Sequence, residues 1–416
     1  MNKHFRRAVA PLAAAALGLT LLSGTDAAAG PADWTAAWAA SPQRASEGFT
    51  SNWAETGFSH QSVRQTVRVT ESGDRVRIRL SNAYGSSPLH ITRATIARAG
   101  EGAAVQKGSL RHLSFGGKRS AVIPAHGQAG ADAAEPRGGA AGSVTVTLYL
   151  AGTTGPATFH AQGFAHSYRA EGDHAADVSG RAFDEHTASW YYLAGVDVEG
   201  EGGARDGGGV ALFGDSITDG FGSTHGANRR YPDALADRID RPVINAGIGG
   251  NLVLNDSAWY GDRGTARFTR DVLDQPGVTT AVVLEGLNDI GFYEAQKAGY
   301  ERPTFWPAPK VSAPELIAGY RALIRQAHER GVQVVGATLL PLGGSDHYGA
   351  HAARISDEVN TWIRTSGEFD AVVDFDRALA DPADPERIAA RYDSGDALHP
   401  NDAGYARMAE EVAEVL

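Results

Sequence analysis

The chain has 416 residues, of which 42% are hydrophobic and 21% charged, as in ordinary globular proteins. Its formal net charge of −11 at pH 7 disfavours nucleic acids and anionic membrane surfaces as partners, because like charges repel. It contains no cysteine, which excludes disulfides, thiol catalysis and cysteine-ligated zinc. The length exceeds that of one ordinary core, so we expect two domains.

Residues 1–29 have the pattern of a secretory signal peptide. Basic residues precede an apolar run at 8–22, and the alanines at 27–29 offer a small-residue cleavage site. The apolar run is short for a membrane-spanning helix, and no later segment is long and apolar enough to span a bilayer. We therefore expect a secreted, extracellular monomer without stable membrane insertion.

Residues 30–198 contain short segments in which apolar and polar residues alternate. The alternation recurs at 62–70, 74–80, 89–97, 143–150 and 188–198. No long helical period intervenes, and glycine, proline and serine mark the turns, so we predict an all-β sandwich domain. In the segment 74–80 three arginines alternate with the apolar residues, and we expect these arginines to form a solvated face.

Residues 199–209 are mostly glycine and predict a flexible linker. From 210 to 416 apolar runs alternate with helical patterns. The runs lie at 210–213, 243–245, 280–284, 332–338 and 371–374. A capping box at Ser312 and Glu315 starts one helix, and the last helix starts near Asp402. Five strands with intervening helices predict an α/β domain, a doubly wound parallel sheet between two helical layers.

Polar or glycine-rich turns follow the first three of these strands and precede the last helix. They contain Gly-Asp-Ser ending at Ser216, Gly-Gly-Asn around Gly250, Gly-Leu-Asn-Asp around Asn288, and Asp-Ala-Leu-His from Asp396 to His399. The strand ends of a doubly wound sheet meet at the crevice where the strand order reverses. If the three strands are neighbours there, these turns converge on one site.

The five residues supply what acyl transfer requires. The hydroxyl of Ser216 is a candidate nucleophile, the imidazole of His399 a candidate general base, and Asp396 can accept the Nδ1 proton. The backbone N–H groups of Gly250 and Ser216 and the side-chain amide of Asn288 are candidate donors to an oxyanion. The serine does not lie in Gly-x-Ser-x-Gly, which argues against the nucleophile elbow of the α/β-hydrolases.

These motifs resemble those of the SGNH (GDSL) hydrolases, in the same order, over residues 210–416. The resemblance implies a flavodoxin-like sheet with Ser216 as nucleophile, His399 as base and Asp396 as its partner. It also implies Gly250 and Asn288 as oxyanion donors, with no metal and no organic cofactor. The region before residue 199 is similar to the β-rich domain of a secreted actinobacterial branch. Many family members carry serine where this chain has glycine at position 249.

Two other assignments of the same residues stay open. Asp215 and Asp219 could bind a metal together with His399, as in a phosphoesterase, although hard divalent metals prefer several clustered ligands. Asp393 could replace Asp396 as the partner of the histidine, although the family spacing favours Asp396.

Structural roles are expected for several nearby residues. We expect Asp289 to be a helix cap. His347 and His351 are four residues apart, and we expect them to lie on the surface of a helix. The segment 291–311 is aromatic and proline-rich, too irregular to be a helix throughout, and forms either a lid or pocket wall beside the site or a surface loop whose aromatic residues patch the core.

We expect a secreted serine ester hydrolase acting on short-chain carboxylic esters, either small molecules or polysaccharide esters such as acetylated carbohydrates. One alternative is a GDSL lipase or phospholipase acting on longer acyl chains. Another, from a different class, is a carbohydrate-binding or adhesive protein with an incidental hydrolase domain. The complete set of candidate catalytic residues argues against the last alternative, whereas fold and residues do not choose among ester substrates.

Overall fold

The computed structural model describes residues 34–136, 139–140, 142–199, 207–301 and 305–416. The predicted signal peptide at 1–29 and most of the predicted linker at 199–209 lie outside these residues. The described residues after the predicted leader form one compact unit. Within this described part, no helix is long and apolar enough to cross a membrane.

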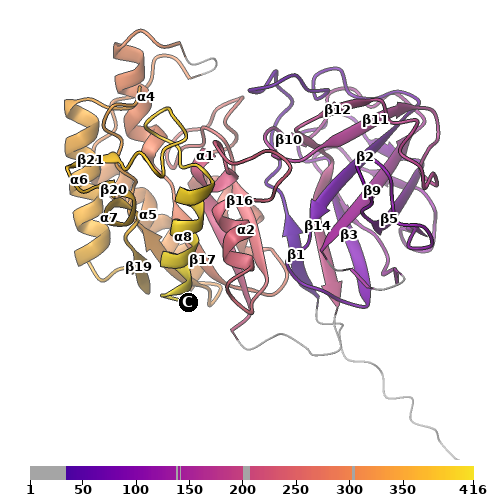
Figure 1. The fold of residues 1–416 in the computed structure, drawn as a ribbon. Coiled ribbons are helices and arrows are strands. Elements are labelled where there is room, and N and C mark those ends of the chain that lie inside the picture. Colours follow the sequence, from indigo (N-terminus) through magenta and orange to yellow (C-terminus); the bar gives the residue numbers. More distant parts are fainter. Residues whose placement is uncertain (1–33, 137–138, 141, 200–206, 302–304) are drawn as a thin grey trace, which may run out of the picture. The chain divides into compact units, whose positions relative to one another are not determined.

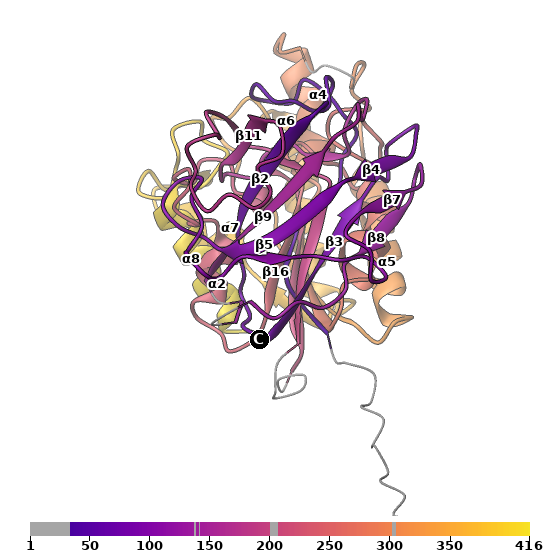
Figure 2. The same ribbon diagram turned by 90° about the vertical axis from the view of Figure 1, so that its right-hand side faces the viewer.

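The described residues before position 200 form antiparallel strands (Figures 1 and 2). A six-stranded sheet has the order β12 (Glu185–Thr187), β11 (Ser167–Glu171), β2 (Gln61–Arg68), β9 (Ser143–Leu150), β5 (Arg93–Arg98) and β6 (Arg111–His112). A four-stranded sheet has the order β1 (Thr35–Ala39), β14 (Leu193–Glu199), β3 (Arg75–Ser81) and β8 (Gln128–Gly130). Short pairs join β10 (Phe159–His160) to β13 (Trp190–Tyr191) and β4 (Leu89–Ile91) to β7 (Ala121–Ile123). The apolar faces enclose one core, and we call this part the β region.

The arginines of β3 form the solvated face that alternation predicts only in part, because Arg75 is exposed whereas Arg77 and Arg79 are half-buried. The apolar residues of this strand are buried as expected. Arg77 and Arg79, however, both pair with Asp197 on the neighbouring strand β14, whose side chain is fully buried. Arg79 also donates a hydrogen bond of 2.6 Å to Gln275, beyond the β region. The prediction was therefore wrong for Arg79, because its end of the strand packs toward the second half of the chain.

The second half contains five parallel strands in one sheet (Figure 1). Their order is β16 (Val243–Gly247), β15 (Gly209–Gly214), β17 (Val278–Leu284), β18 (Gln333–Ala337) and β19 (Ala371–Val373). The first of these five strands in chain order, β15, thus lies between the second, β16, and the third, β17. The predicted doubly wound parallel sheet is confirmed, and the strand order reverses at β15, where such sheets form a crevice.

Every residue of β15 is buried, as expected for a parallel sheet whose two faces are covered by helices. The helices are α1 (Ser216–Asp219), α2 (Tyr231–Ala236), α3 (Gly264–Phe268), the π-helix η1 (Thr269–Leu273), α4 (Leu287–Lys297), α5 (Ala313–His328), α6 (Ala350–Thr365), α7 (Phe375–Leu379) and α8 (Asp402–Ala413). A small hairpin pairs β20 (Ala380–Asp381) with β21 (Asp384–Ile388). Helix α2 packs on α8, whereas α5 packs on α3 and α6.

The segment 291–311 is partly helical. Helix α4 runs through its first seven residues to Lys297, and eight of the eleven residues of this helix are buried, Leu287 and Ile290 included. Apolar residues three and four apart satisfy the helical period, which the later prolines of the segment obscured in the sequence. Residues 302–304 lie outside the described residues.

Candidate active site

Ser216 begins helix α1, which follows the carboxyl end of β15. The strand order of the sheet reverses at this strand. The preceding Asp215 caps this helix, because its Oδ1 accepts the backbone N–H of Ile217 at 3.0 Å. Asp215 is only 2% exposed, and burial raises its pKa to about 6. Its carboxylate therefore braces the turn that presents Ser216.

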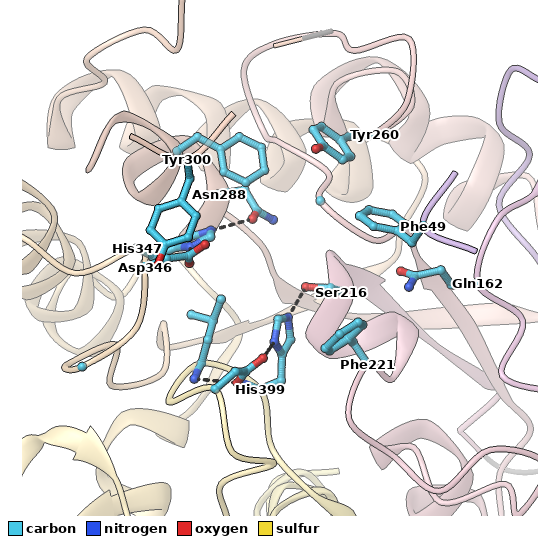
Figure 3. Close-up of a pocket in the computed structure, with 15 residues that line it drawn as sticks. Phe49, Gln162, Ser216, Phe221, Tyr260, Asn288, Tyr300, Asp346, His347 and His399 are labelled. Atoms are coloured by element: carbon cyan, nitrogen blue, oxygen red, sulfur yellow. Dashed lines mark hydrogen bonds and ion pairs between the residues drawn. The ribbon is translucent and has the colours of Figure 1, made fainter. Parts of the chain in front are cut away.

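The side chains of Ser216, His399 and Asp396 form a hydrogen-bonded line (Figure 3). Ser216 Oγ lies 2.8 Å from His399 Nε2, and His399 Nδ1 lies 2.6 Å from Asp396 Oδ2. Burial opposes the charge of Asp396, but hydrogen bonds from His399 and from the backbone N–H of Leu398 hold its pKa well below the usual range. Asp396 is thus a carboxylate that fixes the histidine with Nε2 toward the serine.

Asp393, the alternative partner of the histidine, serves the turn instead. Its Oδ1 accepts the backbone N–H groups of Gly395 and Ala397 at 2.9 and 3.0 Å. The oxygens of Asp396 in contrast contact both the side chain and the backbone N–H of His399. The geometry therefore favours Asp396 as the orienting group.

Gly250 and Asn288 line the same cavity as Ser216. Gly250 has a φ of +75°, and a Cβ there would lie 2.4 Å from the ring of Tyr260, so only glycine fits. Asn288 lies in the first turn of α4, and its Nδ2 donates to Asn251 O at 3.0 Å. That bond uses one of its two N–H groups and leaves the other for a ligand in the cavity.

The cavity has a volume of about 440 Å³, and both halves of the chain line it. Phe292 and Tyr300 come from α4 and the segment after it, while Phe49 and Gln162 come from the β region (Figure 3). Phe292 also belongs to a small buried aromatic cluster with Phe305. The segment 291–311 therefore both walls the cavity and extends the core.

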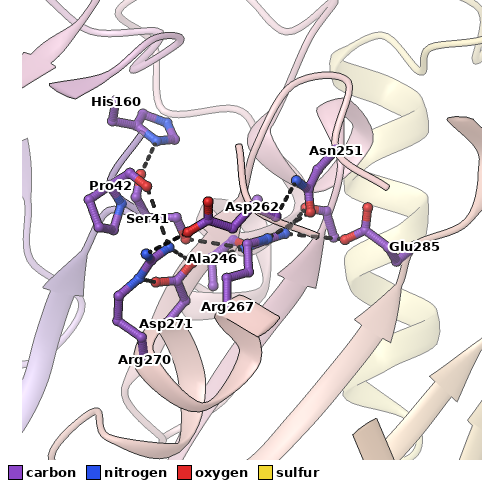
Figure 4. Close-up of polar contacts among 12 residues, drawn as sticks. Ser41, Pro42, His160, Ala246, Asn251, Asp262, Arg267, Arg270, Asp271 and Glu285 are labelled. Carbon is purple, nitrogen blue, oxygen red and sulfur yellow. Dashed lines mark hydrogen bonds and ion pairs between the residues drawn. The ribbon is translucent and has the colours of Figure 1, made fainter. Parts of the chain in front are cut away.

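A buried arginine ties together the strand ends that carry the site (Figure 4). Arg267 is 1% exposed and donates to the backbone oxygens of Gly214 and Ala246, each at 2.8 Å. It also donates to Asn251 Oδ1 at 2.7 Å and pairs with Glu285 at 3.2 Å. These partners stand at the ends of β15, β16 and β17. No motif in the sequence pointed to this arginine.

His347 is buried beside Asn288, contrary to the predicted surface position. It is 3% exposed, its Nε2 lies 3.1 Å from Asn288 Oδ1, and its Nδ1 contacts Asp346 at 2.5 Å. Helix α6 begins only at Ala350, so His347 does not share a helix with His351. The sequence could have indicated a role for His347 at the site only through its location, since its loop follows the carboxyl end of the fourth strand of the parallel sheet.

Asp289 is not the predicted helix cap. Gly286 occupies the N-cap of α4, and the carboxylate of Asp289 accepts the backbone N–H groups of Val253 and Leu254 at 2.8 and 3.1 Å. Burial raises its pKa to about 7. The residue joins the turn after β16 to α4, a contact across 35 residues that capping rules do not address.

Asp219, the other carboxylate considered as a metal ligand, pairs with His160 of the β region. Among the described residues, no group of three or more His, Asp or Glu side chains is placed to hold a metal ion. The carboxylates of Asp215 and Asp219 are instead engaged by backbone N–H groups and by this histidine.

Residues 212–407, which contain all these turns, match the model of the GDSL-like lipase/acylhydrolase family. This segment belongs to that family. The resemblance seen in the sequence is thereby confirmed for the second half of the chain, whose enzyme class is carboxylic ester hydrolase. The similarity of the β region to a secreted actinobacterial branch stays a prediction, as do the roles of the individual residues.

Several solved structures are similar to half of this chain. A putative lipolytic protein of the G-D-S-L family from Desulfitobacterium hafniense is 21% identical, with 50% of this chain and 98% of that chain covered and a TM-score of 0.37. The acetyl xylan esterase AlAXEase is 20% identical, with the same coverages and TM-score. A variant of the acetyl xylan esterase Axe2 from Geobacillus stearothermophilus is 20% identical, covering 50% and 94%, with a TM-score of 0.38. No curated protein sequence matches the chain.

Proposed function

We propose that the protein is a secreted serine esterase that cleaves short-chain carboxylic esters through an acyl-enzyme. The observation that carries this proposal is the line from Ser216 through His399 to Asp396, which opens onto a cavity shared with Gly250 and Asn288. The same arrangement of nucleophile, base and orienting carboxylate supports acyl transfer on unrelated folds.

In this proposal the Ser216 hydroxyl attacks the ester carbonyl while His399 Nε2 takes its proton. The negative oxygen of the tetrahedral intermediate lies against the N–H groups of Ser216 and Gly250 and the amide of Asn288. His399 then returns the proton to the leaving alcohol, and the acyl-enzyme forms. A water molecule, activated by the same histidine, releases the acid and restores the serine. No step requires a metal or organic cofactor.

The walls of the cavity support a preference for short acyl chains. Aromatic side chains from both halves of the chain, Phe49, Tyr260, Phe292 and Tyr300, border a volume of about 440 Å³. Acetyl to butyryl groups fit within this space, and each further methylene must find room against these rings. Small-molecule esters and acetylated polysaccharides both present such groups, so both belong to the proposed substrate class.

A panel of p-nitrophenyl esters from acetyl to palmitoyl, together with acetylated xylan, tests this proposal. We expect kcat/KM to fall steeply beyond about six carbons, and we expect Ser216→Ala to abolish hydrolysis of every ester while the circular dichroism spectrum is unchanged. A kcat/KM on decanoyl esters equal to that on acetyl esters would overturn the short-chain preference in favour of a lipase. Absence of hydrolysis across the panel would overturn the esterase itself and favour a binding role.

A further inference from the structure

A buried histidine of the β region reaches into the loop that follows the proposed nucleophile. His160 on β10 lies with Nε2 3.0 Å from Asp219 Oδ1, at the end of α1, and with Nδ1 2.9 Å from the carbonyl oxygen of Ser41 (Figure 4 shows the Ser41 contact). His160 is 4% exposed and Asp219 1%. A carbonyl and a carboxylate only accept hydrogen bonds, so both ring nitrogens of His160 donate and the imidazole is a cation.

The environment of the ring agrees with this protonation state. Burial by itself disfavours the charge, and Arg230 does so too, but the carboxylate of Asp219 outweighs both and raises the pKa of His160. The ring also stacks on Trp190 at 5.4 Å between centroids. His160 and Asp219 therefore form an ion pair that joins the β region to the GDSL half.

The second oxygen of Asp219 holds the turn that supplies an oxyanion donor. Oδ2 accepts the backbone N–H of Gly249 at 2.9 Å. The N–H of Gly250 lies in the next peptide plane, and only the φ and ψ angles of Gly249 separate the two planes, so anchoring the N–H of Gly249 fixes the plane from which the Gly250 N–H is directed. A Cβ at Gly247 would lie 2.3 Å from the backbone nitrogen of Asp219, so the turn packs directly on α1.

A second residue of the same β-region segment covers this turn. Gln162, two residues beyond His160, is 6% exposed and borders the cavity across from Ser216 (Figure 3). A Cβ on Gly249 would lie 2.1 Å from Gln162 Oε1. Within the described residues, that oxygen has no hydrogen-bond partner. Gln162 thus packs directly against Gly249, so the β region reaches Gly249 both through Gln162 and, by way of His160, through Asp219.

We propose that the β region is a working part of the active site, with His160 acting through Asp219 as a positioning residue for the Gly249–Gly250 turn. This inference rests on the proposed function, in which Gly250 donates to the oxyanion. If the ion pair only docked the two halves of the chain, loss of either hydrogen bond of His160 would affect kcat in the same way. If His160 positions the turn, kcat depends on its hydrogen bond to Asp219 and not on the one to Ser41.

Two substitutions in the full-length protein separate these roles. His160→Gln places an amide N–H near the position of Nε2 and keeps the bond to Asp219, whereas His160→Asn places one near Nδ1 and keeps the bond to Ser41. We expect His160→Gln to retain kcat for p-nitrophenyl acetate within about threefold. We expect His160→Asn to lower kcat by about 10-fold or more, up to the 10²–10³ typical of a lost oxyanion donor, with KM changed by less than about threefold.

His174→Ala is the matched control. His174 also pairs with an aspartate of the β region, Asp177 at 2.8 Å, but its side chain is 30% exposed and does not line the cavity. We expect its kcat and KM to equal those of the wild type. Equal activity in His160→Gln and His160→Asn, whether both are retained or both lost, overturns the positioning role.

Hydrogen–deuterium exchange of the peptide over residues 245–252 gives a readout that does not depend on catalysis. We expect faster exchange in His160→Asn than in His160→Gln and the wild type, because the N–H of Gly249 loses its oriented acceptor. If the wild type hydrolyses no ester, the proposed function fails, and this exchange difference still decides whether His160 positions the turn. Identical exchange in the two variants overturns that role.

Discussion

Two histidine–aspartate pairs in this molecule have the same chemistry and different surroundings. His399 and Asp396 are three residues apart in one loop, with side chains 12% and 40% exposed. His160 and Asp219 come from different halves of the chain, with side chains 5% and 2% exposed. The comparison shows how burial and the third partner of a histidine determine which proton transfers are open to its ring.

The third partner differs in kind. The Nε2 of His399 faces the hydroxyl of Ser216, which can either donate or accept, so the ring can take up and release a proton within a reaction cycle. Both nitrogens of His160 face groups that only accept, so the loss of a proton would leave one buried acceptor without its donor. The more exposed pair is suited to proton transfer and the buried pair to rigidity.

The largest effect we expect comes from breaking the reactive pair. His399→Ala should lower kcat for p-nitrophenyl acetate by about 10⁴-fold or more, as loss of the base does in serine hydrolases. Stability should change by about 1 kcal/mol or less, because water can reach Asp396 and replace the lost partner. Steady-state kinetics and urea unfolding measure the two effects. Residual activity above roughly 10⁻² of wild type would contradict the assignment of His399 as base.

A smaller loss of kcat should follow from removing Asn288, the candidate oxyanion donor whose Oδ1 contacts His347. Asn288→Ala should lower kcat by about 10²–10³ with little change in KM, since the amide binds charge that exists only in the transition state. The matched control is His351→Ala. The ring of His351 forms a hydrogen bond of 2.9 Å with the backbone oxygen of Val311, and this residue does not line the cavity. A rise in KM alone for Asn288→Ala would instead make the residue a substrate-binding group.

Loss of His160 should destabilise the fold more than loss of His399, although loss of His399 should reduce catalysis more. His160→Ala should lower the free energy of unfolding by about 3 kcal/mol or more, because it leaves the carboxylate of Asp219 buried without its cation. The expected loss for His399→Ala is smaller, as given above. Chemical denaturation of both variants at about pH 6, below the ordinary pKa of histidine, measures the order. Equal losses would show that burial does not distinguish the pairs.

The smallest effect concerns pH. The pKa of His160 is raised in the folded protein, so its stabilisation is complete below its unfolded value of about 6.5 and is lost as pH rises through the folded value. The free energy of unfolding of the wild type, relative to that of His160→Gln, should therefore fall as pH rises from about 6 into the alkaline range. The buried carboxyls Asp215 and Asp289 titrate in both proteins and cancel from the difference. A constant difference across this range would contradict a charged His160.

Local pattern was enough to predict the architecture of the second half. Apolar runs bounded by polar turns identified the five strands, and the order of the motifs identified the family, because both signals lie within a few consecutive residues. The turns at Ser216, Gly250, Asn288 and His399 do meet at one cavity, since parallel strands bring their carboxyl ends to one edge. Their catalytic roles stay predictions until the variants above are measured.

Tertiary structure alone decided what surrounds these residues. The burial of Arg267, the contact of His347 with Asn288, the carboxylate of Asp289 on the turn after β16 and the pairing of His160 with Asp219 all join residues far apart in the chain. No periodicity marks such pairs, because a side chain's partner depends on which faces of the sheets and helices pack together. For the same reason the sequence predicted the β region as a separate sandwich, whereas its Phe49 and Gln162 form one wall of the cavity.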